Sequence, residues 1–156
     1  MSDLVSGPVT LEYDDLLHRA GQRLGPTAWT AVTQPQVAGF ADLTHDHQWI
    51  HVDELRAKEG PFGTTIAHGY LTLSLVPFLL GQLLEVTGIS MAVNYGLERV
   101  RFPAPVPVGA SVRATDEIVG VQPGPGSKQV TVRVWVACDA AEKPVCVAVV
   151  VIRFVA

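Results

Sequence analysis

The sequence has 156 residues, of which 48% are hydrophobic and 17% are charged. A chain of this length and composition can bury a sizeable core, which excludes a largely disordered protein. The formal net charge is −4 and the Lys and Arg residues are scattered, which argues against a non-specific nucleic-acid binder, because such proteins carry a basic patch. We expect residues 1–156 to form a single domain.

The two cysteines and the N-terminus both favour a cytoplasmic protein. Cys138 and Cys146 lie in apolar segments, where buried free thiols are a better interpretation than a disulfide or a metal site. The first residues lack the basic start and apolar run of a signal peptide.

Three elements are expected in the first 43 residues. Apolar residues at helical spacing predict a helix over residues 11–24, and residues 29–33 have the character of a short strand. Residues 34–43 again show helical spacing, so this helix would lead the chain directly to Asp46.

Residues 66–84 form an apolar segment of nineteen residues without a formal charge. This length approaches that of a membrane span, but His68, Pro77 and several small polar residues interrupt the segment and no basic cluster flanks it. A helix buried within the protein explains the segment better. Pro77 should bend or divide that helix, because proline removes a backbone hydrogen bond.

The second half of the chain has the composition of a β-sheet. Its runs of β-branched and aromatic residues are separated by short turn segments, so antiparallel pairing of consecutive strands is expected. The fold class is therefore predicted to be α+β, with an antiparallel sheet around the helix of residues 66–84. The expected strands are residues 90–102, 111–121, 128–138 and 144–155.

Asp46 and His51 are the candidate acid and base, and they lie five residues apart. Positions five apart on an ideal helix diverge by roughly 140°, so a turn or loop must separate the two if they cooperate. On spacing alone, a turn residue at Asp46 and a hydrogen-bonded imidazole at His51 are the more common interpretation.

The histidines near Asp46 also raise the possibility of a zinc site. His45, His47 and His51 would supply three nitrogen ligands, but Gln48 and Trp49 lie between them and no helix is indicated there. A zinc site is therefore less favoured than an acid and base pair at Asp46 and His51. His68 is expected to be a hydrogen-bonded residue at the start of the buried helix.

Three motifs follow one another in the chain, beginning at Asp46, Gly63 and Arg101: Asp-His-Gln-Trp-Ile-His-Val-Asp, Gly-Thr-Thr-Ile-Ala-His-Gly and Arg-Phe-Pro-Ala-Pro-Val. In this order they resemble the motifs of the MaoC-like hydratases and dehydratases, a family that includes the (R)-specific enoyl-CoA hydratases and proteins similar to nodulation protein N. Asp46-His-Gln-Trp-Ile-His51-Val-Asp is similar to the family's Asp-x-Asn-Pro-x-His-x-Asp pattern, with Gln48-Trp49 where many members carry Asn-Pro. Gly63-Thr-Thr-Ile-Ala-His-Gly69 resembles the second motif. Arg101-Phe-Pro-Ala-Pro-Val106 resembles the third.

The resemblance implies a hot-dog fold and a hydro-lyase. The expected reaction is the reversible addition of water across a trans-2-enoyl thioester, which makes the protein an (R)-specific enoyl-CoA hydratase or 3-hydroxyacyl-CoA dehydratase. Asp46 and His51 would act on one water, the backbone N–H of Gly69 would bind the thioester oxyanion, and Gln48 would contact water or substrate. The resemblance implies no metal, flavin or nicotinamide cofactor. Coenzyme A is part of the substrate, and an acyl carrier protein thioester is an equal alternative substrate. Family members usually form homodimers with joined sheets.

Two other functions stay open from the sequence. An acyl-thioester hydrolase uses a similar scaffold, and a non-catalytic acyl-thioester binding module fits the likeness to nodulation proteins. Arg99 and Arg101 are expected on one face of a strand, where a solvated face or dimer rim is favoured over contact with coenzyme A phosphates. The aliphatic run of residues 71–84 is expected to be core, with an edge that lines an acyl tunnel.

Overall fold

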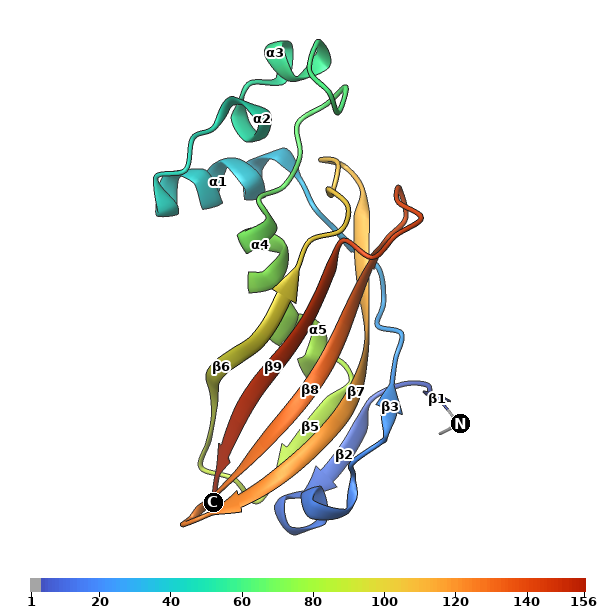
Figure 1. The fold of residues 1–156 in the computed structure, drawn as a ribbon, viewed down its shortest axis with the longest axis vertical. Helices are drawn as coiled ribbons and strands as arrows, with labels where there is room; N and C mark the ends of the chain where they lie inside the picture. The colour runs from blue at the N-terminus through green and yellow to red at the C-terminus, as the bar shows by residue number, and fades with distance from the viewer. Residues whose placement is uncertain (1–3) are drawn as a thin grey trace.

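The computed structural model describes residues 4–156, in which a long curved sheet packs against a divided helix and three small helices gather at one end (Figure 1). The larger sheet has the order β1-β3-β7-β8-β9-β6, with β4 also paired to β7. Its strands are β1 (Leu4–Val5), β3 (Arg23–Leu24), β4 (Thr30–Ala31), β6 (Met91–Arg101), β7 (Ser111–Gly124), β8 (Ser127–Cys138) and β9 (Cys146–Val155). A separate parallel pair consists of β2 (Val9–Glu12) and β5 (Leu84–Thr87).

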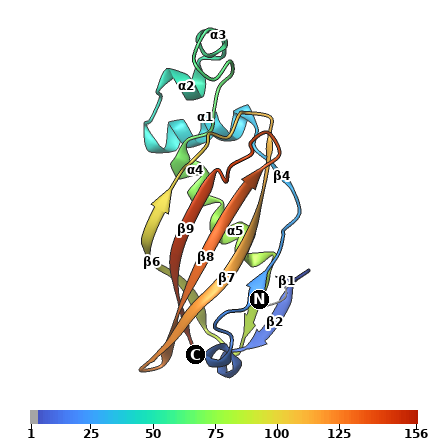
Figure 2. The ribbon, with the colours of Figure 1, turned by 45° about the vertical axis from the view of Figure 1, so that its right-hand side comes forward.

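The core lies between this sheet and the helices behind it. Alternate residues of β7 and β8 are buried, as expected for strands with one face against a core. The helices are a 3₁₀ helix (Tyr13–His18), α1 (Gln34–Thr44), α2 (Trp49–Val52), α3 (Glu54–Lys58), α4 (Gly69–Ser74) and α5 (Val76–Gly81). The turned view shows α5 behind the strands and α1, α2 and α3 beyond one end of the sheet (Figure 2).

The predicted central helix is present but divided. α4 and α5 meet at Leu75, and Pro77 lies in the first turn of α5, where its missing N–H costs no helical hydrogen bond. The prediction that Pro77 bends or divides this helix is confirmed. No helix among residues 4–156 is long and apolar enough to cross a membrane.

The four predicted strands exist, but one pairing differs from the expectation. β7, β8 and β9 pair consecutively and antiparallel, whereas β6 pairs with β9 and not with the next strand in sequence, β7. The segment 102–110 between β6 and β7 contains Pro103, Pro105 and Pro107. Since proline cannot donate to a strand ladder, this segment crosses to the other side of the sheet and leaves β6 at an edge.

The predicted helix over residues 11–24 is wrong. This segment contains β2, the 3₁₀ helix and β3, because Leu11 pairs with Val86 of β5 and Gly21 adopts a left-handed φ of 86°. Leu16 and Leu24 are fully buried nonetheless. The helical spacing correctly marked core residues but not their backbone conformation.

Candidate active site

The chain turns between Asp46 and His51, as their spacing required. α1 ends at His45, which adopts a left-handed φ of 62°, a conformation that commonly terminates helices. Asp46 follows in the connecting loop, and α2 begins after Gln48. One carboxylate oxygen of Asp46 thus reaches within 4.8 Å of a ring nitrogen of His51.

His51 is held as a neutral base. Its side chain is buried, and Nδ1 lies 2.7 Å from the carbonyl oxygen of Ile66. Because a carbonyl only accepts, Nδ1 carries the proton and Nε2 keeps its lone pair. Burial lowers the pKa of His51 below 6.5, with a smaller lowering from His68, while the Ile66 hydrogen bond and Asp46 act in the opposite direction.

Two further contacts fix the position of His51. The side-chain amide of Gln34 in α1 donates to the His51 carbonyl oxygen at 2.8 Å. The N–H of Ile66 donates to the Ile50 carbonyl oxygen at 3.0 Å. α2 is therefore tied both to α1 and to the segment that leads into α4.

His68 connects the two candidate catalytic residues. Its ring stacks on that of His51 with centroids 3.7 Å apart, and its Nε2 donates to the carbonyl oxygen of Asp46 at 2.9 Å. The predicted hydrogen-bonded role of His68 at the start of the buried helix is confirmed. His68 consequently holds the backbone of Asp46 above His51.

Asp46, His51 and His68 together offer three potential metal ligands within 4.8 Å of one another. The two imidazoles are stacked with an interplanar angle of 24°. The lone pairs of the two rings therefore lie in nearly parallel planes and do not converge on one tetrahedral metal ion. The zinc ligands considered from the sequence do not assemble, because His47 instead pairs with Asp42 at 2.8 Å. This geometry fits an acid and base pair better than a metal centre.

His51 and Gly69 line one cavity of about 360 Å³, whose remaining walls are mainly apolar. Gly69 is the first residue of α4, so its N–H has no intrahelical acceptor, and residues 4–156 provide no other acceptor for it. A Cβ on Gly69 would lie only 2.9 Å from the ring of Phe102. Glycine thus permits the close approach of Phe102 and leaves a free donor at the cavity wall.

Gln48 contributes through its backbone. Its N–H lies 3.4 Å from Oδ1 of Asp46, while its side chain is exposed and does not line the cavity. The structure thus places Asp46 beside His51 and places His51 and Gly69 on the wall of one cavity, which neither the Asp46 nor the Gln48 side chain lines. The substrate contact of Gln48 stays a prediction.

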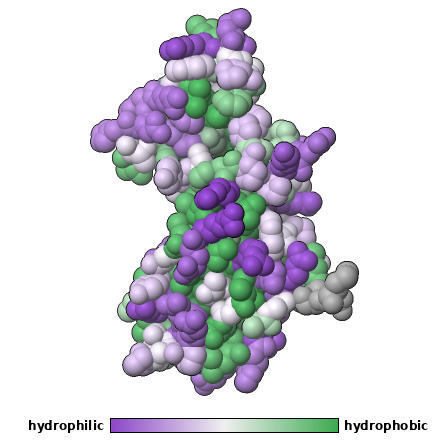
Figure 3. All heavy atoms as spheres, in the orientation of Figure 1, coloured by the Kyte–Doolittle hydropathy of each residue, from purple (hydrophilic) through white to green (hydrophobic). Residues whose placement is uncertain are grey.

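A basic hollow lies on the outer face of the sheet. Arg99 and Arg101 from β6 and Arg133 from β8 line it, and its volume is about 380 Å³. Pro103 belongs both to this hollow and to the cavity lined by His51 and Gly69. Figure 3 shows hydrophilic side chains gathered among apolar ones over the middle of this face.

Comparison with known proteins agrees with this geometry. The family model described as MaoC like domain matches residues 15–139. The chain belongs to the MaoC-like dehydratase family. It is 54% identical over 143 residues to the 3-hydroxyacyl-thioester dehydratase Z of Mycobacterium tuberculosis, covering 91% of this chain and 95% of that protein. It is 35% identical over 114 residues to the (R)-specific enoyl-CoA hydratase of Rhodospirillum rubrum, with 73% and 74% of the two chains covered.

Solved structures of MaoC-like proteins share the fold. The monoamine oxidase regulatory protein of Archaeoglobus superposes with a TM-score of 0.75 at 27% identity, over 99% of this chain and 97% of that chain. The (R)-hydratase from A. caviae gives 0.66 at 27% identity, over 85% and 94%. The predicted hot-dog fold is confirmed.

The sequence did not single out two residues: Phe102, which lies beside the MaoC-like site, and Asp116, which lies in a separate cavity. Phe102 packs against Gly69 from a segment 33 positions away in the chain, a contact without a local signal. Asp116 is a buried carboxyl within the sheet. The sequence did contain a signal for Asp116. This acidic residue occupies an inward position of β7 between Ala114 and Ile118, where strand alternation predicts an apolar residue.

Proposed function

We propose that this protein is an (R)-specific enoyl-CoA hydratase, equally a 3-hydroxyacyl-CoA dehydratase in the reverse direction. One observation supports this most directly: His51, with a free Nε2, and Gly69, with a free N–H, line one mainly apolar cavity, and a carboxylate oxygen of Asp46 lies within 4.8 Å of a ring nitrogen of His51. A base, an orienting carboxylate and an oxyanion donor are the groups that hydration of a conjugated thioester requires.

In the proposed mechanism, one water lies between Asp46 and His51. Its oxygen attacks C3 of the enoyl thioester while Nε2 of His51 accepts one of its protons. The electron pair of the double bond moves toward the thioester carbonyl, whose oxygen accepts a hydrogen bond from the N–H of Gly69. The imidazolium of His51 then returns its proton to C2, and the second hydrogen of the water stays on the new hydroxyl. Asp46 orients the water and stabilises the imidazolium.

The carrier of the acyl group is proposed to contact the basic hollow. The 3-hydroxyacyl-thioester dehydratase relative acts, by its name, on an acyl thioester, and Arg99, Arg101 and Arg133 offer donors suited to phosphate groups. The phosphates of coenzyme A, or the phosphopantetheine of an acyl carrier protein, would reach these residues past Pro103. No additional cofactor has a role in the proposed mechanism.

A homodimer formed along β6 is also proposed. Within residues 4–156, β6 pairs only with β9 and so leaves one edge free, and Met91, Val93, Tyr95 and Leu97 are 40–55% exposed. A free edge with exposed apolar side chains is a favourable site for pairing with a second copy.

Light scattering on two matched variants tests the dimer. Val93→Lys in β6 should shift the protein toward a monomer, whereas Val119→Lys in β7, at an equally exposed valine, should leave the mass unchanged. A wild-type monomer at micromolar concentration would contradict the proposal.

Two further proposals concern the domain organisation and the cellular location of the protein. Residues 1–156 are proposed to act as one domain. The protein is proposed to be cytoplasmic, supported by two buried free cysteines, whose thiols suit a reducing compartment.

The enzymatic proposal is tested with crotonyl-CoA and longer trans-2-enoyl-CoAs. Loss of the conjugated absorbance together with formation of (3R)-hydroxyacyl-CoA is the expected result. Release of free thiol would indicate a hydrolase, and binding without any product would indicate a non-catalytic module. Either result would contradict the proposed hydratase.

A further inference from the structure

A second cavity contains a carboxyl group that the proposed mechanism does not use. This cavity of about 260 Å³ lies between α5 and the strands β6, β7 and β9, and its walls are mostly apolar. Asp116 and Asn94 are the residues with polar side chains among those that line it. Two polar side chains in an apolar cavity indicate a place where a ligand is recognised by hydrogen bonds.

Asp116 is unusual because it is buried without full hydrogen bonding. It is only 2% exposed, and its Oδ1 has no hydrogen-bond partner among the residues that the structure describes. A buried, unpaired polar atom costs roughly 1–3 kcal/mol, so its presence at a core position of β7 requires an explanation. A rotation of the carboxyl group would turn this buried atom toward the cavity that Asp116 lines, where a polar group of a bound ligand would supply the missing partner.

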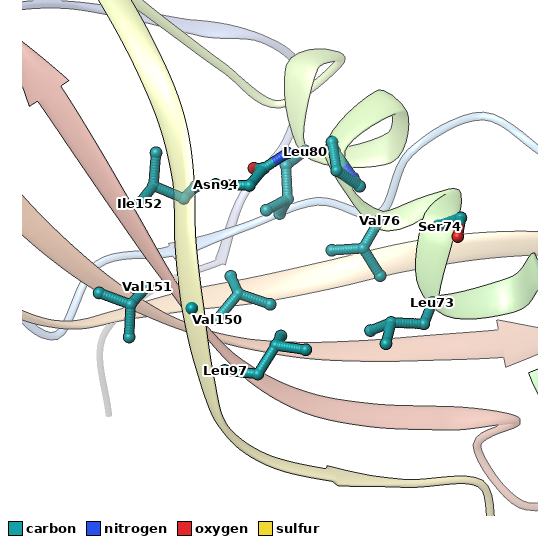
Figure 4. Close-up of a pocket in the computed structure, with 11 residues that line it drawn as sticks. Leu73, Ser74, Val76, Leu80, Asn94, Leu97, Val150, Val151 and Ile152 are labelled. Atoms are coloured by element: carbon teal, nitrogen blue, oxygen red, sulfur yellow. The ribbon is translucent and has the colours of Figure 1, made fainter. Parts of the chain in front are cut away.

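This distal cavity continues into a neighbouring one of about 230 Å³, shown in Figure 4. Both cavities are lined by Asn94, by Ile152 of β9, and by Pro77 and Leu80 of α5. Figure 4 shows Leu80 and Val76 of α5 facing Val150 and Leu97 of the sheet. The two cavities therefore form one apolar trough between helix and sheet.

The trough and the catalytic cavity lie along the same helical stripe. Gly69 of α4 lines the catalytic cavity, Leu73 and Val76 line the near part of the trough, and Leu80 of α5 lines the part that contains Asp116. Residues separated by three and four positions share one helix face. At 1.5 Å per residue of a straight helix, and less for a divided one, Gly69 and Leu80 are at most roughly 16 Å apart along the axis, a distance that an extended acyl chain spans.

We propose that Asp116, assisted by Asn94, binds a hydroxyl group at the distal end of the acyl chain, so that the preferred substrates are enoyl thioesters with a terminal hydroxyl. This inference rests on the proposed hydratase function for the position of the thioester. It adds the chemical class of the acyl chain to that function.

A hydroxyl suits this cavity better than a charged end group. A hydroxyl both donates and accepts, so it pairs with a carboxyl or carboxylate at Asp116 and with the amide of Asn94. An ammonium would require a buried ion pair, and a carboxylate would bring a second acid against Asp116, which are both costly in apolar surroundings. A terminal methyl would leave Oδ1 of Asp116 unpaired.

The test compares acyl chains of equal length that end in a methyl, a hydroxyl or an ammonium group. For wild type, kcat/KM is measured with the trans-2-enoyl-CoAs, and Kd is measured by calorimetry with the saturated acyl-CoAs, which cannot react. We expect the terminal hydroxyl to improve both quantities by roughly tenfold or more over the methyl for chains long enough to reach Asp116.

Three variants identify the group responsible. Asp116→Leu should abolish or reverse the preference, whereas Asp116→Asn should retain part of it because the amide still donates and accepts. Ile118→Leu, at the next inward position of β7 and in the same cavity, serves as the matched control and should change both chains to the same extent. If Asp116→Leu fails to fold, the wild-type comparison and Asp116→Asn still decide the matter.

The outcomes separate this inference from the proposed function. Hydration of methyl-ended chains with no hydroxyl preference in either kcat/KM or Kd would overturn the distal site and leave the hydratase intact. A hydroxyl preference in Kd without turnover of any enoyl-CoA would support the distal site and contradict the hydratase. A preference for the ammonium would overturn the hydroxyl assignment.

Discussion

Replacing Asp116 with Asn should change how the free energy of unfolding depends on pH. Burial raises the pKa of Asp116 from 3.8 to about 7, partly offset by hydrogen bonding from the backbone of Leu24. In the unfolded chain this carboxyl ionises near 3.8, so between the two values the folded protein retains a proton that the unfolded chain has lost. The stability contribution is fully present below pH 3.8 and is lost as pH rises through about 7.

The size of the effect follows from the pKa shift. One pKa unit corresponds to about 1.4 kcal/mol, so the shift of Asp116 from 3.8 to about 7 corresponds to about 4 kcal/mol between acidic and mildly alkaline pH. Asn cannot ionise but has nearly the same shape. The free energy of unfolding of Asp116→Asn should therefore rise relative to that of wild type by up to about 4 kcal/mol as pH rises from about 4 to about 8.

Urea unfolding at several pH values and at one protein concentration measures this difference. The control is Glu117→Gln, the adjacent carboxylate on the opposite face of β7, which is partly exposed and pairs with Arg133. That variant should show a much smaller pH-dependent difference. Parallel pH profiles for wild type and Asp116→Asn would refute the buried, proton-retaining carboxyl.

Three other predictions concern the active site and its entrance. Gly69→Ala should reduce kcat more than it reduces stability, because the new methyl forces Phe102 and the oxyanion donor to move; normal turnover with lost stability would instead mark Gly69 as a packing residue. Replacing Arg99 and Arg101 by Gln should raise KM for enoyl-CoA by at least about threefold with little change in kcat, and should not affect an enoyl-pantetheine that lacks phosphates; equal effects on both substrates would exclude phosphate contact. Because burial lowers the pKa of His51, kcat/KM for hydration should stay constant down to below pH 6.5 and then fall as the imidazole gains a proton; a fall that begins above pH 6.5 would contradict the neutral base.

Local patterns in the sequence predicted the site better than its surroundings. The divergence of positions five apart on a helix required a turn between Asp46 and His51, and the left-handed His45 provides it. Pro77 predicted the division of the central helix, because its missing N–H acts within one turn. Such features depend on a few neighbouring residues, so the sequence contains them directly.

Features that depend on distant contacts were not predictable in the same way. Leu11 lies in a strand because it pairs with Val86, and this tertiary pairing overrides the helical spacing of the segment. Phe102 reaches Gly69 only after β6 has crossed the molecule. Asp116 is an intermediate case, since strand alternation marks its inward position but gives no information about the cavity that it faces.

The central claim is that Asp46 and His51 act as one unit on one water. Hydration of crotonyl-CoA by Asp46→Asn, His51→Ala and the double variant tests it most directly, with acyl-CoA affinity measured alongside. Each single change should lower kcat by roughly 10²- to 10⁴-fold while binding is retained, and the double variant should be little worse than the worse single one. Losses that multiply in the double variant, or normal hydration by either single variant, would contradict the account.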